Sequence, residues 1–544
     1  MRSRIVAGGL ATLLSVVRVG SAVGPALAFG AVLLPGAWPI HNAHAADATP
    51  IGVFTDHADI GKPSSIGGGS VEYDANAKVY TVTGGGENMW AAADHFHYVY
   101  KKVSGDISIA ATIDFVGTSP AAGAPDPHRK ACLVIRQTLD SDAVYADAAA
   151  HGNGLTSLQW RDAKGAVTHE VQSDAVGPRR LRLEKRGNYV SMSIADAGEA
   201  LHPAGGAARI DLTGEFYIGL AVSAHNTGRL EKVAFSNVEI GAPAPATGRT
   251  TLVNTLETIN IQSKDRRVVY VVTQPTRIEA PNWFPDDTNT LFFNTNGKLY
   301  KVQAEPPGTP VIPKRKPPEV IDLGNLTRIN NDHGISPDGK MLAVSDQSQA
   351  VGSQRPSLIY VLPISGGAPK RVTDLGPSYF HGWSPDGKTL AYCAQRNNQF
   401  GVYTISAEGG AEKCLTTTGG KDDGPEFAPD GRHIYFNSDR NGSMQIWCMK
   451  PDGAEPEQIT KDTDIESWFP HISPNGLQMV FLTYEKGAGD HPENKDVTLR
   501  LMDLKTRNVV VLAKLFGGQG TINVPSWSPN SRYLAFISYQ VVPE

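Results

Sequence analysis

Short runs in which apolar and polar residues alternate fill residues 51–240, and glycine, aspartate and asparagine separate them. In Asp106–Ile113, isoleucine or alanine occupies every second position. Side chains along a β-strand point alternately to opposite faces, so this period of two predicts strands with one buried face. Further strands are expected at Lys78–Thr83, Ile107–Phe115, Ala131–Gln137, Leu181–Glu184, Tyr189–Ile194 and Tyr217–Ala224. Because no long helical pattern lies between them, they predict an antiparallel β-sandwich over residues 46–240.

The last strands of this region point to one kind of sandwich. Phe216–His225 and Val233–Val238 resemble the closing strands of concanavalin-like jelly rolls of the laminin-G type, and Gly84–Trp90 and Ser104–Ile113 fit the same pattern. The resemblance implies a jelly-roll domain of a kind that often binds sugars and sometimes acts only as a spacer. Asp94, His95 and His97, near Trp90, are further candidates for a sugar site. Residues 241–250 begin with an uncharged proline-, alanine- and glycine-rich run and are expected to be a linker.

Residues 251–544 carry six copies of one template, in which a short strand leads into a Pro-Asp-Gly-like turn and a second strand follows. The serine position of the template falls at residues 284, 336, 384, 428, 473 and 528, which are 52, 48, 44, 45 and 55 residues apart. Proline presets the first corner of such a turn, aspartate caps it and glycine takes the positive φ. A strand-only repeat of about 40–50 residues is the signature of a β-propeller with one blade per repeat.

This repeat resembles the TolB-type, WD40-like (PD40) propeller repeat over residues 250–544. The last copy stops after its second strand, at Tyr539, and strands expected near Leu256–Ile261 and Arg267–Val272 precede the first copy. We therefore predict an all-β chain with a six-bladed propeller over residues 251–544. Strands from both ends of that segment would complete the sixth blade and leave no free sheet edge.

The first 45 residues resemble a secretory signal peptide. Arg2, Arg4 and Arg18 accompany a stretch rich in Ala, Val, Leu and Gly, and no acidic residue precedes Asp47. Ala43 and Ala45 offer the small residues that a signal peptidase reads, so cleavage is expected before Ala46. Glycine and proline interrupt the apolar run, so no membrane span of about 20 residues is expected there or later. The mature protein is expected in the periplasm or outside the cell.

Charge and cysteine content restrict the classes of partner and metal site that the chain could have. The chain has 50 basic and 55 acidic residues, a formal net charge of −5, and therefore no basic surface typical of nucleic-acid binding. Its four cysteines, Cys132, Cys393, Cys414 and Cys448, lack zinc-binding spacing and lie in apolar strand-like runs. These features favour buried free thiols. The sequence leaves open whether two of the cysteines form a disulfide in an exported protein.

Propeller geometry assigns the chemistry to one end of the central channel. Residues just before each innermost strand and just after each second strand converge there, whereas the Pro-Asp-Gly turns lie at the other end. His333, His381 and His471 come from separate blades and are the candidates for holding a divalent metal ion at this mouth. Hydrogen bonding to water and backbone carbonyls is their alternative role.

The remaining candidates complete an active-site hypothesis. The acid and base candidates are Asp423, Glu426, Asp439 and His471. The candidates for contacting a substrate are Arg396, Arg440, Trp468, Tyr484 and His491. Of these, Arg396 and Arg440 are placed to bind a planar anion with two parallel hydrogen bonds.

Two functions follow from these patterns. In the first, an exported protein holds carbohydrate on the sandwich and binds or cleaves an oligosaccharide, including an acidic one, by metal-assisted lyase or hydrolase chemistry at the mouth. Oligogalacturonate lyases are similar in repeat type and in using channel-mouth histidines to hold a metal near an acidic sugar. In the second, the TolB resemblance implies a non-catalytic periplasmic scaffold for envelope proteins, although TolB carries a small α/β module where this chain is all-β.

Overall fold

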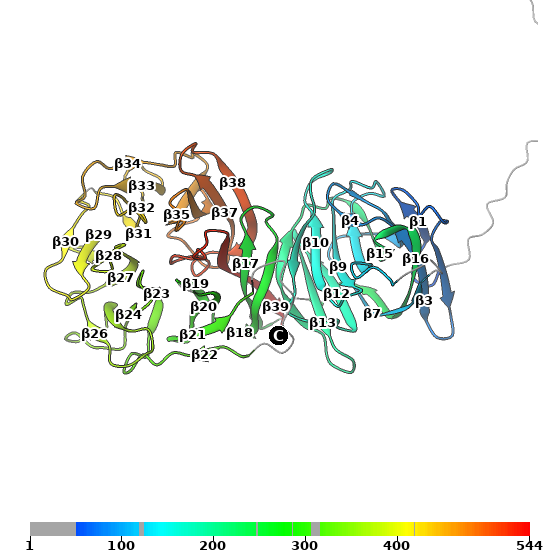
Figure 1. The fold of residues 1–544 in the computed structure, drawn as a ribbon, viewed down its shortest axis with the longest axis horizontal. Helices are drawn as coiled ribbons and strands as arrows, with labels where there is room; N and C mark the ends of the chain where they lie inside the picture. Colours follow the sequence, from blue (N-terminus) through cyan, green and yellow to red (C-terminus); the bar gives the residue numbers. More distant parts are fainter. Residues whose placement is uncertain are drawn as a thin grey trace, which may run out of the picture. The chain divides into compact units, whose positions relative to one another are not determined.

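Strands make up all the regular structure of the described chain. The computed structural model describes residues 51–118, 124–245, 248–285, 287–305, 316–417 and 419–543. Within these ranges it contains 39 strands and no helix (Figure 1), which confirms the all-β prediction. A helix able to cross a membrane is accordingly absent from these same ranges. The predicted signal peptide, residues 1–45, lies outside the described residues, as does Asp286 of the first repeat.

Two sheets form the N-terminal region. The first has seven strands, in the spatial order β14 (His202–Arg209), β13 (Tyr189–Ala195), β12 (Arg180–Arg186), β7 (Ile107–Thr118), β16 (Asn226–Gly241), β3 (Val79–Gly86) and β2 (Ser70–Asp74). The second begins with β1 (Asp56–Ile60), β6 (Phe96–Ser104), β15 (Glu215–Ser223), β8 (Lys130–Arg136), β9 (Tyr145–His151), β10 (Thr156–Arg161) and β11 (His169–Gln172). Both contribute to one apolar core, for example through Ile109, Leu133, Leu181 and Leu220. Two antiparallel sheets around a shared core form the β-sandwich that the alternation predicts.

Strands β12 and β13 show how the alternation produces this core. Leu181 and Leu183 of β12, and Val190, Met192 and Ile194 of β13, are buried, while most of the residues between them are partly exposed. Burial of one such side chain contributes about 1.5–3 kcal/mol. A slip of one residue in register would turn all of these side chains to the opposite face, so the apolar pattern fixes the pairing.

Five four-stranded antiparallel sheets follow and are arranged in sequence around a ring (Figure 1). They comprise β19 (Glu279–Phe284), β20 (Asp287–Thr295), β21 (Lys298–Gln303) and β22 (Glu319–Val320); β23 (Ile329–Ile335), β24 (Met341–Asp346), β25 (Leu358–Pro363) and β26 (Lys370–Arg371); β27 (Ser378–Trp383), β28 (Thr389–Arg396), β29 (Gln399–Ser406) and β30 (Lys413–Cys414); β31 (Asp422–Phe427), β32 (Ile434–Ser438), β33 (Gln445–Met449) and β34 (Glu457–Gln458); and β35 (Ile465–Ile472), β36 (Gln478–Glu485), β37 (Lys495–Asp503) and β38 (Val509–Gly517). The first strand of each sheet contacts the first strand of the next and is therefore innermost. Six separate blades were predicted, and this number is wrong: the described residues form five.

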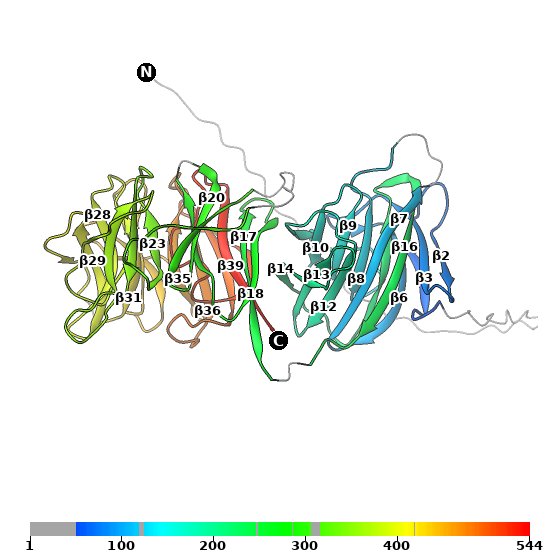
Figure 2. The same cartoon turned by 90° about the horizontal axis from the view of Figure 1, so that it is seen from below.

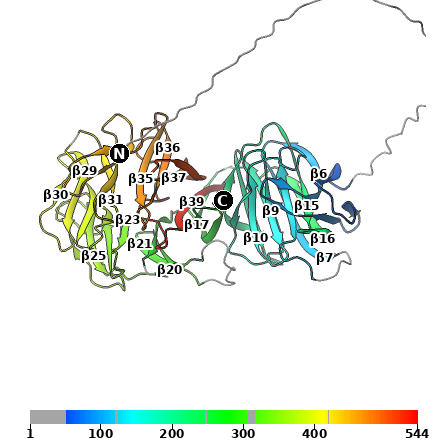
Figure 3. The same cartoon turned by 45° about the horizontal axis from the view of Figure 1, so that its top comes forward.

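The ends of the propeller segment pair with each other and close the ring. β17 (Thr250–Asn260) runs antiparallel to β18 (Arg266–Gln274) on one side and to β39 (Tyr533–Pro543) on the other. Figures 2 and 3 show β17 and β39 side by side, and β39 also contacts β38 and β19. The predicted pairing of strands from both ends is thus present. It does not produce a separate sixth sheet, because β18 pairs in parallel with β11 and these three strands become the end of a ten-stranded sheet.

Arg266 secures the place where the sandwich strands and the propeller strands share this sheet. Its Nε and Nη2 atoms lie 2.8 and 2.7 Å from the Glu257 carboxylate, and Nη1 donates a hydrogen bond of 2.8 Å to the carbonyl oxygen of Ala207. The guanidinium group also lies over the rings of Trp160 and Phe536, 5.6 Å from each centroid. Residues 241–250 therefore do not connect two independent bodies, because a continuous hydrogen-bonded sheet joins what precedes and follows them.

The Pro-Asp-Gly turns have the chemistry that the sequence predicts. In the second copy, Ser336 Oγ donates to Asp338 Oδ1 at 2.6 Å, and the N–H groups of Lys340 and Met341 donate to Asp338 Oδ1 and Ser336 Oγ. Gly339 closes the turn with a φ of 71°. Asparagine replaces the aspartate in the last two copies and accepts the same hydrogen bonds, so these turns are structural.

The four cysteines are free thiols. Cys132, Cys393 and Cys448 are buried as expected, whereas Cys414 is exposed on the outermost strand β30, where one face meets water.

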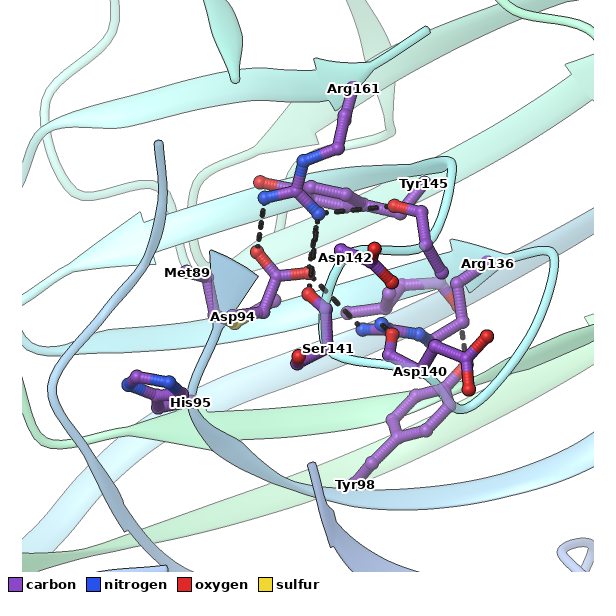
Figure 4. A network of polar contacts seen from close by, with 12 residues as sticks. Met89, Asp94, His95, Tyr98, Arg136, Asp140, Ser141, Asp142, Tyr145 and Arg161 are labelled. Carbon is purple, nitrogen blue, oxygen red and sulfur yellow. Dashed lines mark hydrogen bonds and ion pairs between the residues drawn. The ribbon is translucent and has the colours of Figure 1, made fainter. Parts of the chain in front are cut away.

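Fully buried charges lie on the face of the ten-stranded sheet opposite the apolar core. Asp94 belongs to a short hairpin, β4 (Met89–Trp90) and β5 (Ala93–Asp94), and its carboxylate accepts hydrogen bonds of 2.9 and 2.8 Å from Arg161. Arg136 Nη1 lies 3.5 Å from the same carboxylate, and Figure 4 shows both guanidinium groups directed at it. A buried charge is costly unless it is paired, so Asp94 fastens the hairpin to the sheet instead of lining an open sugar site.

Replacing one partner of this ion pair is expected to destabilise the sandwich. Arg161→Met should lower the free energy of unfolding by about 3–5 kcal/mol, because it removes both hydrogen bonds to a carboxylate that cannot reach water. Urea denaturation followed by tryptophan fluorescence measures the change. Lys164→Met is the matched control: Lys164 pairs with Asp140 and Asp142 at the exposed surface, where water screens the interaction. Equal denaturation midpoints for the two variants would contradict this account.

Candidate functional site

A polar cavity of about 340 Å³ opens at one end of the propeller channel. Four of the four-stranded sheets and residues 519–523 contribute to its wall. Its ionisable residues are Asp332, His381, Cys393, Lys421, Asp423, Asp490 and His491, with Tyr379. Asn330, Asn331, Gln347, Phe400, Phe469, Gln519 and Asn523 complete the lining. We call this cavity the polar mouth.

A second cavity, of about 460 Å³, lies at the end of the channel where the Pro-Asp-Gly turns gather. Its wall is mainly proline and tryptophan from the turns, including Trp283, Trp383 and Trp527. The indole N–H groups of Trp383 and Trp527 donate to the carbonyl oxygens of Gly334 and His471, so these rings are held in place. The Pro-Asp-Gly turns therefore gather at the end opposite the polar mouth, as propeller geometry predicts.

Irregularities in the innermost strands decide which side chains reach the polar mouth. The pairing register shifts in all five of them, between Glu279 and Asn282 in β19 and between Trp468 and His471 in β35, for example. Phe469 adopts a φ of 53° at its shift, in the left-handed region that is uncommon for an aromatic residue. A bulge of this kind adds a residue to one strand. It therefore changes which of the following side chains face the channel.

Asp423 and His381 form the central ion pair of the polar mouth. His381 Nε2 lies 3.2 Å from Asp423 Oδ1, and both side chains are buried. Burial opposes ionisation of each group, but their hydrogen bond and mutual charge outweigh it. They raise the pKa of His381, and, together with His491 and Lys421, they lower the pKa of Asp423. The pair is therefore an imidazolium and a carboxylate between the two ordinary pKa values, 3.8 and 6.5.

The pair stabilises the fold within a defined pH window. The contribution of His381 is complete below its ordinary pKa of 6.5 and is lost as the pH rises through its raised value. The contribution of Asp423 is complete above its ordinary pKa of 3.8 and is lost as the pH falls through its lowered value. Both contributions are complete between these two ordinary values.

A second pair, Lys421 and Asp490, lies at the edge of the polar mouth. Lys421 Nζ is 2.5 Å from both carboxylate oxygens of Asp490, and it lies 5.1 and 5.8 Å from the ring centroids of Phe400 and Trp468. His491 is beside both pairs, with Nε2 3.3 Å from Asp490 and 3.7 Å from Asp423. Burial lowers the pKa of His491, which favours its neutral form.

Only part of the predicted acid and base set reaches the polar mouth. Asp423 does, but Glu426 lines the opposite cavity. His471 is buried with Glu426: its Nδ1 lies 2.6 Å from Glu426 Oε2, and its Nε2 hydrogen-bonds the carbonyl oxygen of Ile522. Asp439 accepts the N–H of Lys421 at 2.6 Å and so orders the start of β31. These four residues therefore do not form one constellation, because Asp423 and Glu426 line cavities at different ends of the channel.

The three histidines predicted as metal ligands do not meet. His381 lines the polar mouth, His471 is engaged as described, and His333 is fully buried with neither ring nitrogen hydrogen-bonded. Burial lowers the pKa of His333 to about 3, so its ring is neutral. Among the described residues, no group of three or more His, Cys, Asp or Glu side chains is arranged to hold a metal ion. The predicted divalent metal site at the channel mouth is not assembled.

The predicted arginine anchors already have acidic partners. Arg396 makes two hydrogen bonds of 2.8 Å to Glu412, and Arg440 Nη2 lies 2.8 Å from Asp422. Neither lines the polar mouth. Each instead binds an acidic residue of its own sheet, so neither guanidinium group is available to an acidic sugar at the polar mouth.

The aromatic candidates support the polar mouth from behind. Trp468 is buried, and its ring packs against Phe469 and His491 with centroids 5.9 and 4.7 Å away. Tyr484 is also buried and does not line the mouth. Of the five predicted substrate contacts, only His491 is part of the cavity wall.

Sequence reasoning left out several residues that form the wall. The candidates did not include the wall residues Asp332, Tyr379, Phe400, Lys421, Phe469 and Asp490. A signal exists for Tyr379, which lies five residues before the serine position of its repeat. The wall residues Asn331, Asp423 and Asn523 have the same position in theirs. Position in the repeat would have identified these residues, whereas Lys421 and Asp490 depend on loop conformation.

Comparisons with known proteins agree with the propeller. Residues 334–542 match the family model described as the TolB beta propeller domain. The uncharacterized protein Atu1656 of Agrobacterium fabrum (strain C58 / ATCC 33970) is 45% identical over 286 residues, which are 53% of this chain and 92% of that protein. The fold and these matches define a TolB-like β-propeller protein. The chain belongs to the same family as Atu1656.

More distant relatives carry the name TolB or a different activity. The Tol-Pal system protein TolB of Francisella tularensis is 27% identical over 222 residues, which are 39% of this chain and 48% of the relative. A solved structure from Agrobacterium tumefaciens, provisionally assigned as TolB, is 43% identical over 54% of this chain and all of that chain, with a TM-score of 0.49. A manganese complex of oligogalacturonate lyase is 12% identical over 53% of this chain and 78% of that chain, with a TM-score of 0.32. A TM-score of 0.32 says nothing about whether the two proteins share an activity.

The ion pair of the polar mouth yields a direct prediction. In Asp423→Asn, the pKa of His381 should fall below its ordinary value of 6.5, because burial is no longer offset by the carboxylate. Titration of the imidazole Cε1–H signal by NMR measures this pKa, and the spectrum of His381→Gln assigns the signal. Asp374→Asn, which removes an exposed carboxylate elsewhere on the propeller, should leave the titration unchanged. An unaltered His381 pKa in Asp423→Asn would refute the pairing.

Proposed function

We propose that this chain is a TolB-like binding scaffold of the bacterial envelope, exported by cleavage before Ala46, that receives a protein partner at the polar mouth. The observation that carries the proposal is the cavity itself. Side chains from four separate sheets converge there around charged and aromatic groups, which is the usual composition of a binding site. The match to the TolB propeller model supports the same class of function.

The arrangement of ionisable groups favours binding over catalysis. The predicted acid and base residues are divided between two ends of the channel, and Asp423, the one that reaches the mouth, is held ionised by His381. A general acid or base works best with a pKa near the operating pH and with access to the reacting proton. Asp423 does not meet the first condition, because its pKa is lowered.

A pull-down from a detergent-solubilised envelope fraction tests the scaffold. The wild-type protein should recover a lipoprotein or membrane complex after cross-linking. Gln347→Trp should abolish the recovery, because it fills the polar mouth without removing a charge. Leu477→Trp is the matched control, since Leu477 is exposed in a turn at the other end of the channel. Recovery that survives Gln347→Trp, or no envelope protein above the bead background, would refute the proposal.

A glycan is a second candidate for the polar mouth. The rings of Tyr379, Phe400 and Phe469 lie in the same wall as Asp332 and Asp423, and aromatic faces beside carboxylates suit a sugar that offers hydroxyl groups. A concanavalin-like jelly roll in the sandwich would be a second place for a sugar to bind. Because the arginines are occupied, a neutral sugar fits this site better than an acidic one.

A polysaccharide panel separates this candidate from the scaffold. We expect neutral oligosaccharides to bind without forming reducing-end or unsaturated products. A chelator should have no effect, because the described residues include no cluster of side chains arranged to hold a metal ion. Calorimetry and product analysis with and without chelator make the measurement. Binding that is unchanged in Gln347→Trp would place the sugar elsewhere, and no binding by any member of the panel would remove the candidate.

A further inference from the structure

We infer that the polar mouth recognises a cationic group, an ammonium or guanidinium carried by its partner, which binds beside the Asp332 carboxylate. This inference rests on the proposed function for its location, and it adds the chemistry of the ligand. It reverses the sign of the anionic ligand that the sequence suggests.

A census of charge in the cavity shows which group lacks a counterion. Asp423 is paired with His381, and Asp490 is paired with Lys421. Asp332 is the remaining carboxylate in the wall, and no ion pair joins it to any basic side chain of the described residues. When Asp332 is ionised, the mouth therefore carries one uncompensated negative charge.

The position of Asp332 makes that charge effective. Its residue is only 6% exposed, and the side chain of Asn330 accepts its backbone N–H at 3.1 Å, which fixes the local chain. Water screens a charge poorly in such a place, so a ligand cation would interact with it strongly. Burial, with the charges of Asp423 and Glu279, raises the pKa of Asp332 to about 7, and the charge of His381 opposes this rise.

The mouth already binds one cation of its own by the same chemistry. The ammonium group of Lys421 combines a carboxylate partner, Asp490, with two aromatic faces, Phe400 and Trp468. Cation–π contact and a carboxylate together compensate an ammonium group for lost water. Asp332 shares its cavity with Tyr379 and Phe469, so a second cation would find the same two kinds of group.

The groups around Asp332 give the interaction a defined pH dependence. His381 on β27, Asp423 on β31 and Glu279 on β19 act on Asp332, while Lys421, Asp490 and His491 line the same cavity. Ionisation of Asp332 as the pH rises through about 7 creates the negative charge. Loss of the proton from His381 at higher pH removes a repelling positive charge. Both changes strengthen the binding of a cation as the pH rises.

Calorimetry with short capped peptides tests the inference on the full mature chain. The probes are acetyl-Gly-Arg-Gly-amide, the neutral acetyl-Gly-Gln-Gly-amide and the acidic acetyl-Gly-Glu-Gly-amide, each at pH 6 and pH 8 and at low salt. The arginine peptide should bind best, and about tenfold more tightly at pH 8 than at pH 6. In Asp332→Asn, its affinity at pH 8 should fall by about tenfold or more. Asp464→Asn removes an exposed carboxylate just before β35 and should change neither value.

A measurement on the wild-type protein alone guards against a misfolded variant. Binding at pH 7 in two buffers of different ionisation enthalpy should reveal release of a fraction of a proton, because the cation drives Asp332 to ionise. At pH 9 this release should vanish. Equal or tighter binding of the neutral or acidic peptide, or no binding of the arginine peptide, overturns the inference, as does full affinity in a folded Asp332→Asn. A mouth-dependent envelope partner found in the pull-down would leave the scaffold intact in each of these cases.

Discussion

The antiparallel pairing of β17 with β39 is the interaction on which the rest of the propeller depends. It joins residues almost 300 positions apart in sequence, from Thr250↔Pro543 to Asn260↔Tyr533, and so closes the ring. Without it, the edges of β17 and β39 would present unpaired backbone groups, a hazard that proteins avoid. Closure also brings the innermost strands to a common axis. The polar mouth exists only because those strands converge.

Several fully buried charges among the described residues are paired with an opposite charge. Arg161 with Asp94 and Arg266 with Glu257 are fully paired and tie strands together. Asp423 and His381 are paired as well, at the floor of an open cavity. A buried carboxylate without a cation, such as Asp332, is costly in a finished structure. Its position in a cavity, and not within a packed sheet, distinguishes a binding role from a structural one.

The repeat predicted more of the fold than of the site. Each template marks a strand, a turn and a second strand, and local chemistry is sufficient for these, as the bonds between Ser336 and Asp338 show. The number of separate blades could not be read in the same way. β18 pairs with β11, a strand of the sandwich, and no local pattern in either strand announces that partner. Candidate residues failed for a similar reason, since Asp423 and Glu426 lie on one innermost strand but line cavities at different ends of the channel.

The sequence by itself determined the all-β class, the strands of the sandwich, the repeated turns and the end of the channel at which charged residues gather. These features depend on alternation and turn chemistry within a few residues. Only the tertiary structure decided that Arg396 and Arg440 have partners of their own, that three histidines stay apart, and that Asp332 keeps no counterion. Such outcomes depend on which distant side chains share a buried space, and the energy of a charge is set by that space.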